Sequence, residues 1–111
     1  MKLLLSSDVT LSHAHDVTLG PDSRVHFHGL IVTLMIEYPA FEPADESTAR
    51  GLWKVLLAEV TDKDLRDIPG IRPTFSSLAL NLLERARSQV SANAVAVRIA
   101  CPVDGWEIRS G

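Results

Sequence analysis

The spacing of hydrophobic residues changes twice along this chain, and the change limits the folds that it can adopt. Apolar and polar side chains alternate with a period near two in residues 3–15 and again in residues 25–38, which predicts two long strands. A turn with the sequence Gly-Pro-Asp-Ser, at residues 20–23, separates them. Two strands joined in this way are expected to pair as an antiparallel hairpin.

The period then lengthens to that of amphipathic helices, which are predicted over residues 45–60 and 75–86. Alternation returns at residues 95–101, and a Pro-Val-Asp-Gly turn leads into a short last strand at residues 106–108. The order of elements is therefore ββααββ. It predicts an α+β fold in which an antiparallel sheet carries both helices on one face.

Local signals indicate where the helices begin and which side chains are buried. Asp45 and Ser47 are candidate caps for the first helix, and Thr74 is the candidate cap for the second. Trp53 falls on the apolar stripe of the first helix. Cys101 lies on an apolar strand face, where a cysteine is typically a buried core thiol.

The length and the net charge of the chain limit the number of domains and the kinds of partner that it can have. The 111 residues correspond to a single domain, residues 1–111. The net charge of −3 argues against nucleic-acid binding, and the apolar runs are too short to predict a membrane span. The single cysteine and the short apolar start are typical of a cytoplasmic protein.

A core this small leaves little room for an enclosed pocket, so we expect any site at an interface in a homo-oligomer.

All four histidines lie between positions 13 and 28, as the pairs His13-Ala14-His15 and His26-Phe27-His28. Residues i and i+2 of a strand point to the same side, so each pair can direct two imidazoles at one point. Three imidazoles with an open fourth position are typical of a catalytic zinc site. Copper, nickel and iron also accept such ligands.

Short segments along the whole chain, taken together, form a further pattern. They are Leu11-Ser12-His13-Ala14-His15, His26-Phe27-His28, Asp64-Leu65-Arg66-Asp67-Ile68-Pro69-Gly70-Ile71, Pro73-Thr74 followed by Leu78-Ala79, Ala94-Val95-Ala96-Val97-Arg98 and Trp106-Glu107-Ile108-Arg109. Together they resemble the 6-pyruvoyltetrahydropterin synthase / 6-carboxytetrahydropterin synthase family over nearly the whole chain. The resemblance implies zinc held by His15, His26 and His28, with His13 at a position that is usually small.

The resemblance also implies the tunnelling fold, in which ββααββ subunits join edge to edge as trimers or hexamers with pockets between subunits. The family eliminates triphosphate from dihydroneopterin triphosphate. Zinc polarises the side-chain oxygens of the substrate, a cysteine acts as the base, and an Asp-His pair relays protons. A strand glutamate anchors the pterin.

The chain departs from this pattern at the positions of the family's catalytic base, proton relay and pterin-anchoring residue. Asp22 stands at the cysteine position and is the candidate base, and Asp62 is the candidate proton relay. The anchoring glutamate falls on Ile99, or on Cys101 if the register slips by one side-chain period. Glu107 is the candidate replacement in binding the substrate.

Two hypotheses follow. The first is a zinc-dependent carbon–oxygen lyase that acts on a pterin-like or other small hydroxylated or phosphorylated substrate at a subunit interface. The second is a non-catalytic oligomeric relative that binds a metal or a ligand.

Overall fold

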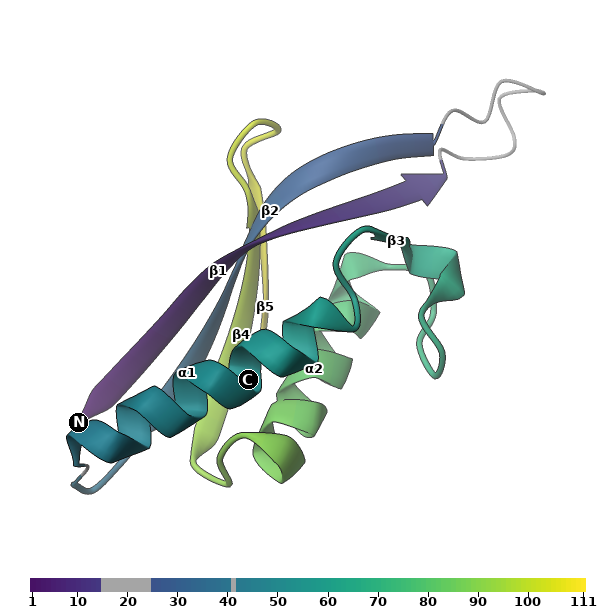
Figure 1. The fold of residues 1–111 in the computed structure, drawn as a ribbon. Coiled ribbons are helices and arrows are strands. Elements are labelled where there is room, and N and C mark those ends of the chain that lie inside the picture. Colours follow the sequence, from purple (N-terminus) through teal and green to yellow (C-terminus); the bar gives the residue numbers. More distant parts are fainter. Residues whose placement is uncertain (15–24, 41) are drawn as a thin grey trace.

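The sheet has five strands in the order β3-β1-β2-β4-β5, and the computed structural model describes residues 1–14, 25–40 and 42–111. Figure 1 shows the long hairpin of β1 and β2, the two helices that follow it and the second hairpin at the C-terminal end. The bounds are β1 Lys2–Ala14, β2 Val25–Glu37, α1 Pro43–Ala58, β3 Lys63–Asp64, the 3-10 helix η2 Leu65–Asp67, α2 Phe75–Gln89, β4 Ala94–Cys101 and β5 Trp106–Ser110. The predicted α+β class is confirmed.

The register of β1 against β2 decides which side chains face the helices. Leu5 pairs with Leu34 and Leu11 pairs with His28, in one uninterrupted antiparallel ladder. Leu5, Leu11 and Leu34 are all buried. Directly opposed residues share a face of the sheet, so His28 lies on the same face as this buried row.

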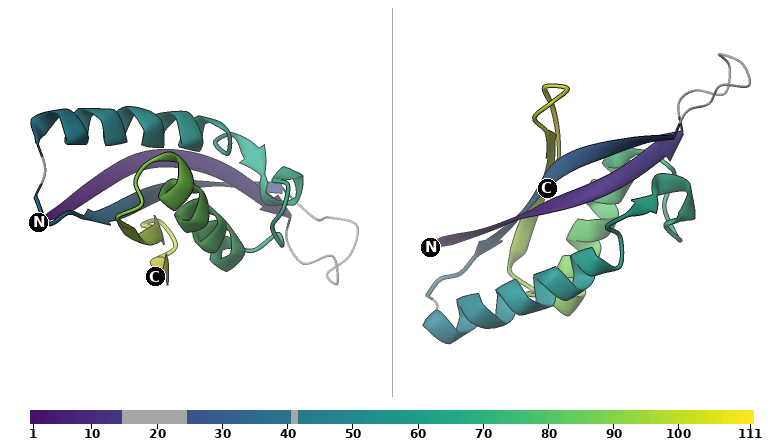
Figure 2. Two further views of the ribbon diagram at one scale, coloured as in Figure 1. Left: turned by 90° about the horizontal axis from the view of Figure 1, so that it is seen from below. Right: turned by 45° about the horizontal axis from the view of Figure 1, so that its top comes forward.

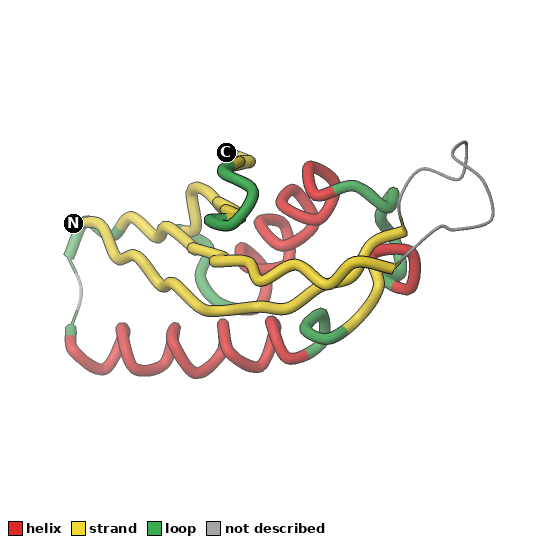
Figure 3. Tube along the Cα trace, turned by 90° about the horizontal axis from the view of Figure 1, so that it is seen from above, coloured by secondary structure: helices red, strands yellow, loops and turns green. Residues whose placement is uncertain are grey.

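The helices cover that face. Figure 3 shows α1 running alongside the β1–β2 hairpin, and α2 contacts β4 and β5, an arrangement that the two views of Figure 2 also show. Side chains from α1, α2, η2 and the strands β1, β2 and β4 form one buried cluster, against which Trp106 and Ile108 of β5 pack. Its largest members are Trp53, Leu5, Leu11, Leu30, Leu34, Ile36, Leu56, Leu65, Leu78, Leu82, Leu83 and Ile99. The predicted burial of Trp53 on α1 is confirmed. In the part of the chain described here, no helix is long and apolar enough to cross a membrane.

A bulge interrupts the ladder between β2 and β4. Ile36 pairs with Ala94, whereas the neighbouring Met35 pairs with Ala96, so Val95 is an extra residue on β4. The alternation in the sequence predicts Val95 on the same face as Val97. The structure buries Val97 as predicted, but it buries Ala94 beside Val97 and leaves Val95 half-buried, because the bulge takes up one residue.

Two local features differ from the sequence-based expectation. Helix α1 begins at Pro43 and its N-cap is Glu42, with Asp45 at the third helical position accepting a hydrogen bond from the Glu42 amide at 2.8 Å. Asp45 therefore belongs to a reciprocal capping box rather than being the cap itself. Thr74 caps α2 as predicted, accepting from the Ser77 amide at 3.2 Å.

The second difference is the two-residue strand β3, which the sequence did not indicate and which pairs parallel with β1 at Leu11 and Ser12. Its Asp64 caps η2 through the Arg66 amide at 2.9 Å and contacts the buried Ser12 hydroxyl at 3.3 Å. The Arg66 guanidinium also donates to this carboxylate at 2.9 Å. The hydrogen bond from the Arg66 side chain lowers the pKa of Asp64 below the ordinary value of 3.8.

The lowered pKa of Asp64 makes a pH-dependent contribution to stability. The ionised carboxylate is stabilised in the folded state, so its contribution is present above the unfolded pKa and is lost as the pH falls through the lower folded pKa. We expect Asp64→Asn to lower the free energy of unfolding by about 1 kcal/mol at pH 7. The difference from the wild type should vanish at low pH, as measured by urea unfolding at a series of pH values. A difference that persists unchanged below the folded pKa would contradict this assignment.

Neighbouring residues of α1 provide a test of the core. Leu56 is 1% exposed and Val55 is 65% exposed. We expect Leu56→Ala to lower the free energy of unfolding by about 2–5 kcal/mol because it leaves a cavity. Val55→Ala should change it by less than about 0.5 kcal/mol. Thermal and urea unfolding of both variants measure the two values, and equal losses would contradict the packing of α1 against the sheet.

Candidate metal centre

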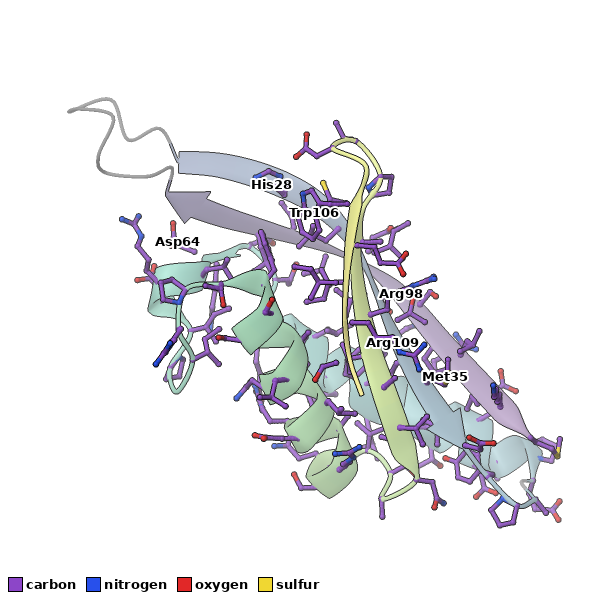
Figure 4. The ribbon with its side chains drawn as sticks, turned by 180° about the vertical axis from the view of Figure 1, so that it is seen from behind. His28, Met35, Asp64, Arg98, Trp106 and Arg109 are labelled. Atoms are coloured by element: carbon purple, nitrogen blue, oxygen red, sulfur yellow. The ribbon has the colours of Figure 1, made fainter. Side chains whose placement is uncertain are left out.

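The candidate metal centre lies where the β4–β5 hairpin meets the helix-facing side of β2. Figure 4 shows His28 and Trp106 at the same end of the sheet, while Met35, Arg98 and Arg109 lie further along it and Asp64 lies apart from them. His28 comes from β2, Cys101 ends β4, and Asp104 belongs to the turn that leads to β5. Side chains from two distant parts of the sequence, residue 28 and residues 101–104, therefore meet at one point.

The donor atoms of these three side chains are close together. The Nδ1 atom of His28 lies 3.1 Å from Oδ2 of Asp104 and 3.9 Å from Sγ of Cys101. The Cys101 thiol donates to the same Asp104 oxygen at 3.6 Å. The His28 side chain is 15% exposed and that of Asp104 is 48% exposed, whereas Cys101 is buried. The group is thus closed on the core side and open to solvent through Asp104.

The sequence of the turn explains how Asp104 reaches His28. Pro102 follows the last strand residue and cannot continue the pairing as a donor. Gly105 has a φ of 70°, a conformation that glycine adopts without the penalty of a side chain, and its amide donates to the Cys101 carbonyl at 2.9 Å. The turn therefore places the carboxylate three residues after Cys101 over the same space as the thiol.

Aromatic side chains form a wall beside the imidazole. Phe75, the first residue of α2, meets His28 edge to face, with ring centroids 6.1 Å apart and ring planes at 83°. Phe75 also packs against Trp106, with ring centroids 4.8 Å apart. Thr74 sets the start of α2 and so the position of Phe75. These rings restrict the orientation of His28.

Imidazole, thiol and carboxylate are all ligands of transition metals, and their three donor atoms lie within 4.8 Å of one another. Zinc bonds of about 2.0 Å to nitrogen or oxygen and about 2.3 Å to sulfur place tetrahedral ligands roughly 3.3–3.6 Å apart. Of the observed separations, 3.6 Å falls within that range, 3.1 Å lies just below it and 3.9 Å just above it. The residues at this site therefore fit a metal such as zinc.

The other histidines are placed only in part. His13 pairs with His26 in the β1–β2 ladder, and neither side chain is described. His15 and Asp22 lie outside the described residues. The last described steps of the ladder pair His13 with His26 and Ala14 with Val25, so the backbone brings the first residue of one H-x-H segment beside the first residue of the other. Coordination by His15, His26 and His28 stays a prediction.

The remaining two candidate residues lie away from His28 within one chain. Asp62 is exposed, has a φ of 62°, and donates its amide to the Thr10 carbonyl, just before β3 at the β1 edge of the sheet. Strands β1 and β2 separate it from Cys101. Glu107 lies 3.7 Å from Arg98, to which it is ion-paired, and both are exposed. Its neighbour Trp106 packs against the core, so Glu107 is on the opposite face of the sheet.

Sequence reasoning missed Asp104 altogether. Cys101 is buried, as its apolar neighbours predict, but its contact with His28 was not predicted. The available signal was the spacing Cys101-Pro102-Val103-Asp104-Gly105, in which a tight turn carries a carboxylate back toward the strand end. Which residue of β2 the turn would reach depends on the register in which β4 pairs with β2 and could not be predicted from that spacing.

Comparison with known proteins supports the fold. The structure superimposes on 6-pyruvoyl tetrahydropterin synthase from Caenorhabditis elegans with a TM-score of 0.74, covering 100% of this chain and 96% of that one. The fold is that of this synthase. The two sequences are only 13% identical, so the likeness shows the fold alone. No protein-family model and no curated protein matches the sequence.

The burial of Cys101 gives a direct test of this part of the structure. Cys101 is 1% exposed and is the single cysteine of the chain. We expect the native protein to react with a thiol reagent at least about ten times more slowly than the protein in urea, because an enclosed thiol is protected from attack. Colour release by Ellman's reagent measures both rates. Equal rates would contradict the closed core side of the site.

Proposed function

We propose that this chain is a divergent, zinc-binding relative of the 6-pyruvoyltetrahydropterin synthases and acts as a carbon–oxygen lyase. The observation that carries the proposal is the half-buried His28, which is held between Asp104 and Phe75 on the fold of that synthase. An imidazole fixed in this way, open on one side and closed on the other, suits a metal that must also meet a substrate.

In this proposal His15, His26 and His28 hold the zinc. The β-ladder supports it, because His26 and His28 are separated by one residue on β2 and the paired ends of β1 and β2 adjoin position 15. The same register makes His13, the partner of His26, an additional candidate ligand. When bound, zinc would polarise an oxygen of the substrate and make the neighbouring C–H more acidic.

Asp22 would take the proton released from carbon, and Asp62 would pass a proton to or from the leaving group. The substrate would be pterin-like, or another small hydroxylated or phosphorylated compound, with Glu107 accepting hydrogen bonds from it. Cys101 stands at one of the two positions where the pterin-anchoring glutamate was expected, and a buried thiol cannot accept the two N–H groups that a carboxylate accepts. This favours a substrate other than dihydroneopterin triphosphate.

We propose further that the active pocket forms between subunits of a cytoplasmic homo-oligomer, a trimer or a hexamer. Within one chain Asp62 lies at the β1 edge of the sheet and Glu107 lies on the face opposite His28, so the three side chains can serve one substrate only if a second subunit supplies part of the pocket. β5 forms one edge of the sheet, and β3 covers only Leu11 and Ser12 of β1 at the other. Both edges therefore offer backbone groups to a neighbouring strand.

The alternative is a non-catalytic member that keeps the oligomer and the metal as a binding unit. The observation that favours it is the same Cys101, since the group that would hold a pterin is absent from the strand. In this case the protein would bind zinc and a small ligand without turnover.

Metal analysis and a lyase assay test the proposal. We expect about one zinc per chain in the wild type and a loss of at least tenfold in zinc affinity in His28→Ala, since one ligand is removed. Glu37→Gln, an exposed change at the end of the same strand, is the control and should bind normally. A folded wild type that takes up no zinc would contradict the proposal.

The assay separates the two functions. We expect no triphosphate release from dihydroneopterin triphosphate. Zinc-dependent release of phosphate from other phosphorylated hydroxy compounds, reduced at least about a hundredfold by Asp22→Ala, would support the lyase. A zinc-loaded protein that binds such compounds without converting them would support the binding unit instead.

A further inference from the structure

We propose that Asp104 is a positioning residue that selects the metal-binding nitrogen of His28. It would accept the hydrogen bond from Nδ1–H, so that Nε2 is the nitrogen that coordinates the metal. This inference rests on the proposed function, because it concerns the same zinc, and it assigns a role to a residue outside the three histidines.

The first step is the hydrogen bond between the two side chains. Nδ1 of His28 and Oδ2 of Asp104 are 3.1 Å apart, a distance typical of N–H···O hydrogen bonds. An ionised carboxylate only accepts, so Nδ1 must carry the proton. A neutral imidazole with a proton on Nδ1 has its lone pair on Nε2. Metal-bound histidines typically donate their other N–H to a carboxylate in this way, which fixes the ring and raises its basicity.

The second step is the support of the carboxylate itself. The Cys101 thiol donates to the same Oδ2 atom at 3.6 Å, and the thiol is held by the buried end of β4. A half-exposed aspartate on a turn would otherwise sample several rotamers. The thiol and the imidazole together restrict it to one, so Cys101 acts on His28 through Asp104.

The third step is the fixed geometry around the pair. The Gly105 amide closes the turn onto the Cys101 carbonyl at 2.9 Å, and Phe75 meets the His28 ring edge to face. The carboxylate and the imidazole are thus held by separate elements, the β4–β5 turn and the junction of β2 with α2. Such restraint keeps the ligand oriented before the metal arrives.

A different role for the same atoms is direct coordination by His28 Nδ1, Cys101 Sγ and Asp104 Oδ2. The hydrogen-bonding interpretation is favoured because the N–O pair has the shortest of the three separations, while Cys101 Sγ lies 3.9 Å from Nδ1. In direct coordination the thiol would lose its proton and bond to the metal, whereas a positioning network keeps that proton on sulfur. The two arrangements therefore differ in spectroscopy.

The first measurement needs no metal. Long-range ¹H–¹⁵N spectra of the zinc-free protein at pH 8, with the His28 signals identified from His28→Ala, report which ring nitrogen carries the proton. We expect the proton on Nδ1 in the wild type and a shift toward Nε2 in Asp104→Ala. Asp104→Asn retains a carbonyl acceptor and should preserve the wild-type pattern. A proton on Nε2 in the folded wild type would overturn the inference.

The second measurement is zinc affinity by competition with a chromophoric chelator. We expect Asp104→Ala to weaken binding by about 10–100-fold, with a smaller loss in Asp104→Asn. Asp8→Asn, an exposed carboxylate change on β1, is the matched control, and circular dichroism verifies that each variant is folded. Unchanged affinity in Asp104→Ala beside a zinc-binding wild type would overturn the positioning role alone. A wild type that binds no zinc would overturn the proposed function as well.

The third measurement separates positioning from direct coordination. We expect the cobalt-substituted protein to lack a thiolate-to-metal charge-transfer band in the near ultraviolet, and Cys101→Ser to retain the visible cobalt spectrum. A charge-transfer band that disappears in Cys101→Ser would identify Cys101 as a ligand and overturn the positioning role.

Discussion

The structure depends on the register of the β1–β2 ladder. The pairing of Leu5 with Leu34 and of Leu11 with His28 places the apolar residues and the histidine on one face. A slip of one residue would reverse every side chain of the shifted strand, exposing the leucines and moving His28 to the side that the helices do not cover. The cost of exposing the core therefore also fixes the position of a candidate metal ligand.

Sequence patterns were sufficient for most of the fold. The change of period from two to 3.6 and back predicted the order of elements, because one face of each element has to be buried against another. The cap at Thr74 was predicted from a side chain that satisfies an exposed amide. The parallel strand β3 was not predicted, since two residues are too few to show a period, and its pairing depends on the Asp64 contact with Ser12.

The candidate site was predictable only as far as it lies within single strands. The spacing of His26 and His28 is a property of one strand and can be seen in the sequence. The meeting of His28 with Cys101 and Asp104 joins positions 73 or more residues apart, and it depends on the curvature of the sheet and the shape of one turn. No local pattern contains that information. Glu107 illustrates the same limit, because its face could be assigned only once Trp106 was seen to pack inward.

The comparison with the synthase separates what the fold retains from what it has changed. A similar backbone at 13% identity shows that the sheet and its two helices tolerate almost complete replacement of side chains. The likeness at this identity concerns the backbone alone, so the roles of the histidine pairs and of the residues around them depend on each side chain and not on the scaffold.

The bulge at Val95 has a consequence for how such a scaffold can vary. Ala94 and Cys101 are seven positions apart, and a regular strand would put them on opposite faces. Both are nevertheless buried beneath the helices, because Val95 takes up the odd residue. A change in the length of the link between α2 and β4 can therefore be absorbed at the start of the strand while its far end keeps its orientation. The loop between α2 and β4 can therefore diverge without turning Cys101 away from His28.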